Sequence, residues 1–472
     1  MADPLDLRAE REPALELALA EATRFLATLD DGAVRDRDAD SVADAIGGAL
    51  PADGSGAVEA LRELADALPA ATRSAGPRFF HFVIGGATPA ALAADWLTSA
   101  LDQNAGLWTS SPLGGQLESV SIAWLKELFG LPTDWGGVLT TGATMANFVG
   151  LASARRWYGE QHGVDVEKQG LASLPPLPVF SSGYIHASAE KALAMLGIGT
   201  ESVRRLTRDD AGRLDADALE RELAAVGGPA ILIGTAGEVN AGGFDPIAAM
   251  ADLAERYGAW LHVDGAFGLF ARVTPWAAPL AEGIDRAHSV IADGHKWLNV
   301  PYECGFAFVR DGRYQAGAFN AGAPYLTSRG DRPMWGFLGP EMSRRARAFA
   351  TWATLRAYGR DGYRAMVERH LRLARRVAEQ VEMTPELELL ASVDLNVICF
   401  RLHPPGMDDE QALDELNTRV GAAVIEDARV YFGTTVYRGR VCFRPAIVNW
   451  LTTERDVDLI VEVVRELATV EA

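Results

Sequence analysis

The amino-acid sequence predicts an α/β fold in which a mainly parallel sheet is covered by helices. Between about residues 135 and 310, short apolar runs alternate with longer segments that have apolar residues at helical spacing. The short runs are continuously apolar rather than alternating, which is typical of parallel strands buried on both faces. With 472 residues, 49% of them hydrophobic, the chain is long enough for two or three domains.

Composition narrows the class of protein. The formal net charge of -20 argues against a nucleic-acid partner or an anionic membrane surface. The N-terminus lacks the pattern of a secretory signal, and no apolar run is long enough to span a membrane. Cys304, Cys399 and Cys442 form no CxxC pair, so we expect no metal site, no disulfide framework and a cytoplasmic location.

Residues 1–90 are predicted to be an N-terminal helical segment. The runs "PALELALAEATRFLATL" and "AVEALRELADAL" have apolar positions at helical spacing, and Asp, Gly and Pro separate them. These helices hold too few apolar residues for a core of their own. We therefore expect the segment to pack on a partner subunit.

Residues 91–360 are predicted to be the large α/β domain, and residues 361–472 a smaller α+β domain. The predicted strands of the large domain are "GGVLTT", "PVFSS", "PAILIGTA", "AWLHVDG", "HSVIADG" and "CGFAFVRD". Its last helix, "SRRARAFATWATLRAYG", is predicted to end at Gly359. Ligands of such domains bind beyond the carboxyl ends of the strands.

Two strand ends lead into helices through small or polar residues. Gly142, Ala143 and Thr144 follow the strand "GGVLTT" and form a candidate phosphate cup, although for this motif alone a simple helix cap at Thr144 is the commoner explanation. His186 opens a helix after "PVFSS", where it either caps the helix or offers a flat ring.

Two further strand ends carry charged groups. Asp264 ends the strand "WLHVD", and a buried carboxylate requires a cation from the protein or from a ligand. Lys296 follows the strand "HSVIA" in apolar surroundings, where an amine tends to lose its proton. An amine, a carboxylate, an anion cup and a flat ring are the four groups that pyridoxal phosphate needs.

These residues resemble a known family. "HVDGAFG", then "GHKW" with Lys296 32 residues after Asp264, and "HAS" upstream, are similar to the group II pyridoxal-phosphate-dependent amino-acid decarboxylases, which include the aromatic-L-amino-acid and glutamate decarboxylases. The resemblance runs from "GPRFFHF" to "TTERDVDLIVEVV". It implies the aspartate-aminotransferase-like fold, called fold type I, and a homodimer with the active site near the subunit interface.

The resemblance also implies residue roles. Lys296 would hold the cofactor as an aldimine, Asp264 would pair with the pyridinium, and His186 and Ala266 would lie on opposite faces of the ring. Tyr325, in a loop after the lysine strand, would protonate the substrate carbon. The residues implied around the phosphate are Ala143, Thr144, Asp293 and His295.

Two departures from the family pattern concern contacts to the cofactor. Glu238 and Val239 stand where many relatives have a Thr-Thr pair. Asp293 stands where some relatives have Asn, which adds negative charge beside the phosphate.

The resemblance implies that the chain converts an L-amino acid to its amine and carbon dioxide. Phe80, His81 and Phe82 match positions that line the substrate side chain in aromatic-amino-acid relatives, so an aromatic substrate is favoured, and Trp108 is a further candidate. Alternatives are an aldehyde synthase, an aminotransferase and a non-catalytic member of the fold. An aminotransferase needs a carboxylate clamp, for which Arg345 and Arg444 are candidates, although each is also explained as an ordinary ion-pair partner.

Overall fold

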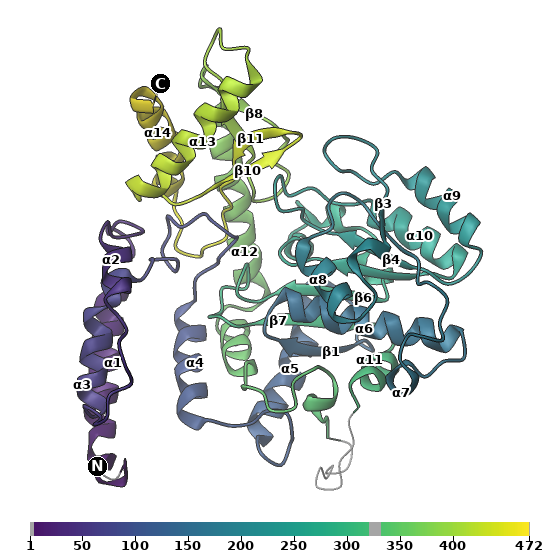
Figure 1. Cartoon of the computed structure of the whole chain (residues 1–472), viewed down its shortest axis with the longest axis horizontal. Coiled ribbons are helices and arrows are strands. Elements are labelled where there is room, and N and C mark those ends of the chain that lie inside the picture. Colours follow the sequence, from purple (N-terminus) through teal and green to yellow (C-terminus); the bar gives the residue numbers. More distant parts are fainter. Residues whose placement is uncertain (1–3, 321–331, 472) are drawn as a thin grey trace.

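A computed structural model of the protein describes residues 4–320 and 332–471. Its large sheet has seven strands in the order β1-β7-β6-β5-β4-β2-β3 (Figure 1). Four of its pairings are parallel and two are antiparallel, so the predicted mainly parallel α/β fold is confirmed. The strands are β1 (Gly136–Thr140), β2 (Val179–Ser181), β3 (Val203–Arg205), β4 (Ile231–Thr235), β5 (Trp260–Asp264), β6 (Ser289–Asp293) and β7 (Gly305–Val309).

β7 is the one strand of this sheet that runs against its neighbours, since it pairs antiparallel with both β6 and β1. Residues 294–304, which join β6 to β7, form no helix. A parallel return needs a crossover of a dozen or more residues, usually a helix, so this shorter connection brings the chain back in the opposite direction. The connection contains Lys296 and holds it at the strand ends.

Helices cover both faces of the large sheet (Figure 1). Leu261 of β5 belongs to the same apolar cluster as Met250 of α10, whereas Trp260 next to it clusters with Leu151 of α6. Because neighbouring residues of a strand point to opposite faces, α6 and α10 cover opposite sides. The helices of this region are α4 (Pro89–Leu101), α5 (Pro112–Phe129), α6 (Ala143–Gln161), α7 (Val166–Gln169), α8 (Ala187–Met195), α9 (Ala216–Val226), α10 (Ile247–Tyr257) and α11 (Gly312–Phe319).

A second, four-stranded sheet, in the order β10-β11-β9-β8, lies in the C-terminal part with its own apolar cluster. The helix α12 (Ala348–Glu382) leads into it and is interrupted at Gly359, where φ is 61° and ψ is -174°, as the sequence predicts. The other elements are β8 (Leu387–Leu389), β9 (Phe400–Leu402), α13 (Glu410–Asp427), β10 (Thr434–Tyr437), β11 (Arg440–Phe443) and α14 (Glu454–Glu471).

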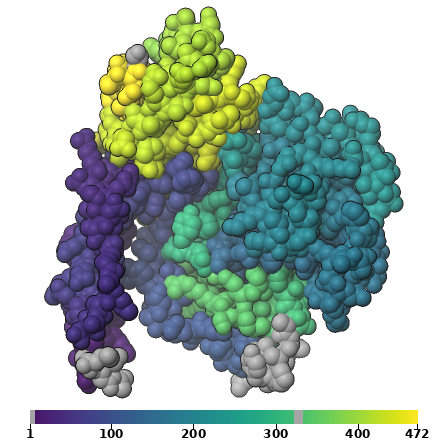
Figure 2. All heavy atoms as spheres, in the orientation of Figure 1, coloured from purple at the N-terminus to yellow at the C-terminus, as the bar shows by residue number. Residues whose placement is uncertain are grey.

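The N-terminal helices α1 (Arg11–Leu26), α2 (Ala39–Asp44) and α3 (Ala57–Asp66) form an arm beside the body of the molecule (Figure 2). None of the described residues of α1 and α3 is buried. The arm is attached near its upper end, where the Val34 amide donates to the Ala428 carbonyl and Arg78 donates to the Gly32 carbonyl. Across the described chain, the helices lack the combination of length and apolar character that crossing a bilayer requires.

Candidate functional site

A cavity of about 390 Å³ opens at the carboxyl ends of β1, β5 and β6, which is a size typical of small-molecule sites. It is lined by all eight residues that the sequence assigns to the cofactor: Ala143, Thr144, His186, Asp264, Ala266, Asp293, His295 and Lys296. Residues up to 153 positions apart in the chain therefore share one site, because the carboxyl ends of parallel strands meet at one edge of the sheet.

Asp264 is a buried carboxylate, 4% exposed, at the end of β5. Its Oδ2 accepts a hydrogen bond from Asn147 Nδ2 at 2.8 Å, and its Oδ1 accepts one from the Ala266 amide at 3.1 Å. Among residues 4–320 and 332–471, no cationic nitrogen lies within 4.0 Å of it. A buried carboxylate with polar but no cationic neighbours fits a ligand that brings its own positive charge, such as a pyridinium.

Lys296 extends into the same cavity from the connection after β6. Its Nζ lies 3.1 Å from Asp293 Oδ2 and 5.8 Å from the centre of the Phe267 ring, and its side chain is 17% exposed. The amine is therefore largely removed from water and still open to a ligand. This position suits an amine that bonds covalently to an aldehyde.

The predicted phosphate cup lies at the first turn of α6. Gly142 precedes the helix without a side-chain cap, so Thr144 is not the cap. Asp293 Oδ1 instead accepts a hydrogen bond from the Ala143 amide at 2.5 Å. A Cβ at position 142 would lie 3.0 Å from His295 Cε1, so glycine leaves room for the imidazole. A helix N-terminus beside an imidazole fits a phosphate group. A phosphate that binds the Ala143 amide would have to displace Asp293 from it.

A buried ion pair holds the strand that leads into this cup. Arg344 donates to both oxygens of Glu118 at 2.9 and 2.8 Å, and also to the Leu139 carbonyl at 2.5 Å. Glu118 accepts a hydrogen bond from the Leu139 amide at 3.0 Å. Because β1 is an edge strand, the pair satisfies backbone groups that would otherwise be unpaired.

His186 caps α8, since its Nδ1 accepts a hydrogen bond from the Ser188 amide at 3.2 Å. Nδ1 also lies 2.7 Å from Ser188 Oγ. Burial lowers the pKa of His186, which outweighs the opposing effect of Asp264. The lowered pKa favours the neutral imidazole, and the capping and stacking interpretations of this residue are compatible.

Sequence reasoning overlooked several residues of the cavity wall, among them Tyr184, Phe267, Tyr302 and Glu303. The Tyr302 ring stacks on His295, with ring centres 4.1 Å apart and planes inclined by 20°. Glu303 pairs with Arg347 at 2.7 Å. Tyr302 and Glu303 follow "HKWLNV" within seven positions of Lys296, and this proximity in the sequence could have identified them as site residues.

Glu238 and Val239, which replace the usual Thr-Thr pair, lie in different surroundings. Val239 lines the cavity, and its carbonyl accepts a hydrogen bond from Arg444 at 2.6 Å. Glu238 turns back on its own loop, where it accepts hydrogen bonds from the Asn240 and Ala241 amides at 2.7 and 2.9 Å. Burial raises the pKa of Glu238, although these hydrogen bonds oppose that effect. The acidic replacement therefore closes a loop and adds no charge to the cavity wall.

The predicted substrate residues are not among those that line the cavity. Phe80 is 1% exposed and belongs to the apolar cluster of the C-terminal part, so it is a core residue. His81 accepts a hydrogen bond from the Gly433 amide, and burial together with Arg444 lowers its pKa to about 4. Phe82 is 60% exposed beside His81.

Two other candidates, Trp108 and Arg345, are not among the residues that line the cavity. Trp108 stacks under Arg332, with the guanidinium carbon 4.3 Å from the ring centre. Arg345 pairs with Asp95 at 2.9 Å, so the ion-pair interpretation holds for it. Tyr325 lies outside the described residues.

A second buried acid, Asp245, supports the wall behind Tyr184. Its Oδ2 accepts hydrogen bonds from Ser182 Oγ and the Thr235 amide, both at 2.9 Å. Burial raises the pKa of Asp245 to about 7. The folded protein therefore binds this proton more tightly than the unfolded chain, in which an aspartate titrates near 3.9.

We expect Asp245 to make the free energy of unfolding fall as the pH rises from about 4 to about 7, because the charged form is disfavoured only in the folded state. Asp245→Asn should remove this contribution. Urea unfolding at half-unit pH steps, with wild type and variant at one cofactor concentration, measures the difference between the two slopes. Parallel slopes would show that Asp245 does not titrate in this range.

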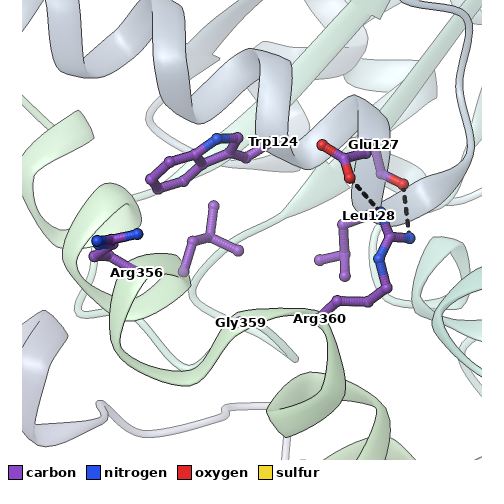
Figure 3. Close-up of a pocket in the computed structure, with 7 residues that line it drawn as sticks. Trp124, Glu127, Leu128, Arg356, Gly359 and Arg360 are labelled. Carbon is purple, nitrogen blue, oxygen red and sulfur yellow. Dashed lines mark hydrogen bonds and ion pairs between the residues drawn. The ribbon is translucent and has the colours of Figure 1, made fainter.

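A second cavity, of about 320 Å³, lies between α5 and α12 beside Gly359 (Figure 3). Two of its charged side chains are already engaged with each other, since Arg360 donates to Glu127 Oε1 at 2.7 Å and to the Glu127 carbonyl at 3.1 Å. The described lining has neither a histidine nor a lysine. We therefore assign the chemistry to the cavity that contains Lys296.

Comparison with known proteins identifies the family and the fold. Residues 60–403 match the pyridoxal-dependent decarboxylase conserved domain. An L-2,4-diaminobutyrate decarboxylase of Rhizobium meliloti is 32% identical over 89% of this chain and 84% of its own length. An aromatic-L-amino-acid decarboxylase of Bacillus atrophaeus is 27% identical over 83% of this chain and 81% of its own length. The crystal structure of Oryza sativa TDC with PLP and tryptamine matches in fold, with a TM-score of 0.91 over 99% of both chains at 24% identity.

Proposed function

Because this chain belongs to the pyridoxal-dependent decarboxylase family and is a carboxy-lyase that uses pyridoxal phosphate, we propose that it converts an L-amino acid, preferably an aromatic one, to its amine and carbon dioxide. The observation that carries the proposal is the convergence of Lys296, Asp264 and His186 on one cavity at the strand ends.

Each of these residues has a separate task. Bound pyridoxal phosphate supplies a conjugated ring that accepts the electron pair left when carbon dioxide departs. Lys296 would hold the cofactor covalently through its amine, and Asp264 would hold a proton on the pyridine nitrogen. His186, which lines the same cavity, would stack on the cofactor ring. Orientation of the substrate then decides which of its bonds breaks.

Two substrate classes have support from the cavity wall. Tyr184, Phe267 and Tyr302 give it flat apolar surfaces, which favour an aromatic side chain. Glu303 favours a side chain with an ammonium group instead, since Arg347 is shared between Glu303 and Glu341 and one negative charge remains in excess. The second class is that of the Rhizobium meliloti relative.

A substrate panel tests the function and separates the classes. L-Tryptophan, L-tyrosine, L-2,4-diaminobutyrate and L-glutamate are assayed for carbon dioxide and amine, with keto acid and ammonia measured in parallel. Glu303→Gln should raise KM for the diamino acid alone. Keto acid without carbon dioxide would replace the proposal with an aminotransferase.

We expect Tyr325→Phe to keep carbon dioxide release and to shift the product from amine to aldehyde. This prediction rests on the sequence, in which Tyr325 matches the family's proton donor. Without the phenol the reacting carbon is protonated slowly and is open to oxygen, so each aldehyde formed should consume one O₂ and one water and release ammonia and hydrogen peroxide. Amine and aldehyde are measured side by side. An unchanged amine yield at an unchanged rate would remove Tyr325 from the mechanism.

We also propose that the enzyme is a homodimer in which the N-terminal arm covers the partner. Leu15, Leu19 and Leu64 of α1 and α3 are 64%, 54% and 58% exposed, which is costly for a lone chain. Light scattering should give twice the 50.6 kDa mass of one chain, and Leu15→Asp with Leu64→Asp should lower it. A 50.6 kDa wild type would contradict the proposal.

A further inference from the structure

A row of polar side chains lies beneath the cavity, on the face of the sheet that α6 covers. Trp260, His262 and Asp264 alternate along β5 and therefore point to the same face. Ser289 of β6 stands opposite His262 in the pairing of the two strands, and Asn147 reaches the row from α6. All are buried, with exposures between 0% and 4%.

These five residues form a continuous hydrogen-bond chain. Trp260 Nε1 lies 3.0 Å from Ser289 Oγ, which is 2.8 Å from His262 Nδ1. His262 Nε2 is 2.8 Å from Asn147 Oδ1, and Asn147 Nδ2 is 2.8 Å from Asp264 Oδ2. The chain therefore ends on the carboxylate that faces the cofactor.

The direction of the chain is fixed at both ends. An ionised carboxylate only accepts hydrogen bonds, so the Asn147 amide nitrogen must face Asp264 and its oxygen must face His262. His262 then donates from Nε2. Burial lowers the pKa of His262 to about 4, so its ring is neutral, and the unprotonated Nδ1 accepts from the Ser289 hydroxyl. At the far end the Trp260 indole can only donate.

The packing makes room for this arrangement. A Cβ at Gly150, one turn after Asn147 on α6, would lie 2.6 Å from His262 Cε1 and 2.7 Å from His262 Nδ1. A real Cβ does not approach other atoms so closely, so the helix passes over the ring only because residue 150 is glycine.

Asn147 has a second branch. Its Nδ2 also donates to Ser188 Oγ at 3.2 Å, and Ser188 Oγ lies 2.7 Å from His186 Nδ1. Because Nδ1 of His186 already accepts from the Ser188 amide, it is an acceptor for the Ser188 hydroxyl as well. The Asn147 amide thus links Asp264, the expected partner of the pyridine nitrogen, to His186, the residue expected to stack on the cofactor ring.

We propose that Asn147 is a positioning residue, which orients Asp264 and His186 together and keeps Asp264 ionised by donating the last hydrogen bond of a chain that begins at Trp260. This inference rests on the proposed function in that Asp264 is taken to face the pyridine nitrogen. Donation to the charged form of a carboxylate stabilises that form. Without Asn147, the proton shared with the pyridine nitrogen should lie closer to Asp264.

The test compares Asn147→Leu, Ser289→Ala and the double variant with the wild-type holoenzyme loaded with pyridoxal phosphate labelled with ¹⁵N in the ring. In Asn147→Leu the ¹⁵N shift should move toward the unprotonated nitrogen, and kcat should fall by about tenfold or more, the scale found for supporting residues of active sites. Ser289→Ala should move both in the same direction by less. The double variant should equal Asn147→Leu, because Ser289 acts only through Asn147.

Ser153→Ala is the matched control, since Ser153 is a buried serine of α6 whose hydroxyl, among the described residues, bonds the Val149 carbonyl alone. It should leave the ¹⁵N shift unchanged. An unchanged shift in Asn147→Leu, or additive effects in the double variant, would overturn the inference while leaving the decarboxylase function intact. Failure of the wild type to bind pyridoxal phosphate would instead overturn the proposed function.

If Asn147→Leu does not fold, the tautomer of His262 in the wild type tests the inference instead. NMR of protein labelled with ¹⁵N-histidine, with His262→Gln used to assign the signal, should show a neutral ring with hydrogen on Nε2. Hydrogen on Nδ1 would reverse the direction of the chain and contradict the inference.

Discussion

Lys296→Ala is expected to abolish turnover and the covalent link to the cofactor. The sequence contains four lysines, Lys126, Lys168, Lys191 and Lys296, and of these Lys296 lines the cavity. Loss of its amine removes the group that holds the cofactor aldehyde, so kcat should fall by roughly 10³-fold or more, as it does when other covalent catalysts lose their nucleophile.

Borohydride reduction followed by peptide mapping measures this directly. The wild type should carry the reduced cofactor on Lys296, and the variant should carry none. Lys191→Ala is the matched control, because Lys191 is exposed on α8, the helix that His186 caps. Reduced cofactor found on Lys126, Lys168 or Lys191 in the wild type would refute the assignment of the site.

Asp264→Asn is expected to keep the fold and lose most of the activity. The amide has the same size, and its oxygen still accepts the hydrogen bond from Asn147 that is 2.8 Å long in the wild type. It carries no charge, however, and cannot hold a proton on the pyridine nitrogen. We expect kcat to fall on the order of 10²-fold or more, the range typical of a lost proton partner.

Asp245→Asn provides the control for this variant, since Asp245 is similarly buried at 2% exposed, does not itself line the cavity and bonds the Ser182 hydroxyl and the Thr235 backbone amide. Its kcat should stay close to that of the wild type. The comparison uses kcat, cofactor absorbance and the denaturation midpoint of both variants. Full activity of Asp264→Asn would leave Asp264 with a structural role only.

Local patterns in the sequence predict the strands that carry the site. Continuous apolar runs mark β1, β4, β5, β6 and β7, and each predicted cofactor residue follows such a run or opens the next helix. Parallel strands end at one edge, so the meeting of Asp264, Lys296 and His186 follows from the fold class. The break of α12 at Gly359 was predictable for a similar reason, because glycine tolerates the positive φ found there.

Other features depend on contacts between residues distant in the sequence. Phe80 is predicted from the sequence to line the substrate side chain, yet it belongs to the core of the C-terminal part. Glu118 and Arg344 are 226 positions apart and meet at the edge of β1. No local pattern pairs such residues, because their partners are set by how α5, β1 and the segment before α12 pack together.

The sequence by itself therefore determined the fold class and the cofactor, and it predicted the amine and the carboxylate of the site, because each of these depends on a short run of neighbouring residues. Only the tertiary structure decided that Asn147, 117 positions from Asp264, donates to its carboxylate, and that Glu238 turns away from the cavity. A hydrogen bond needs donor and acceptor within about 3 Å in a suitable direction. Such geometry arises only when α6 lies over β5, and the spacing of residues along the chain does not encode it.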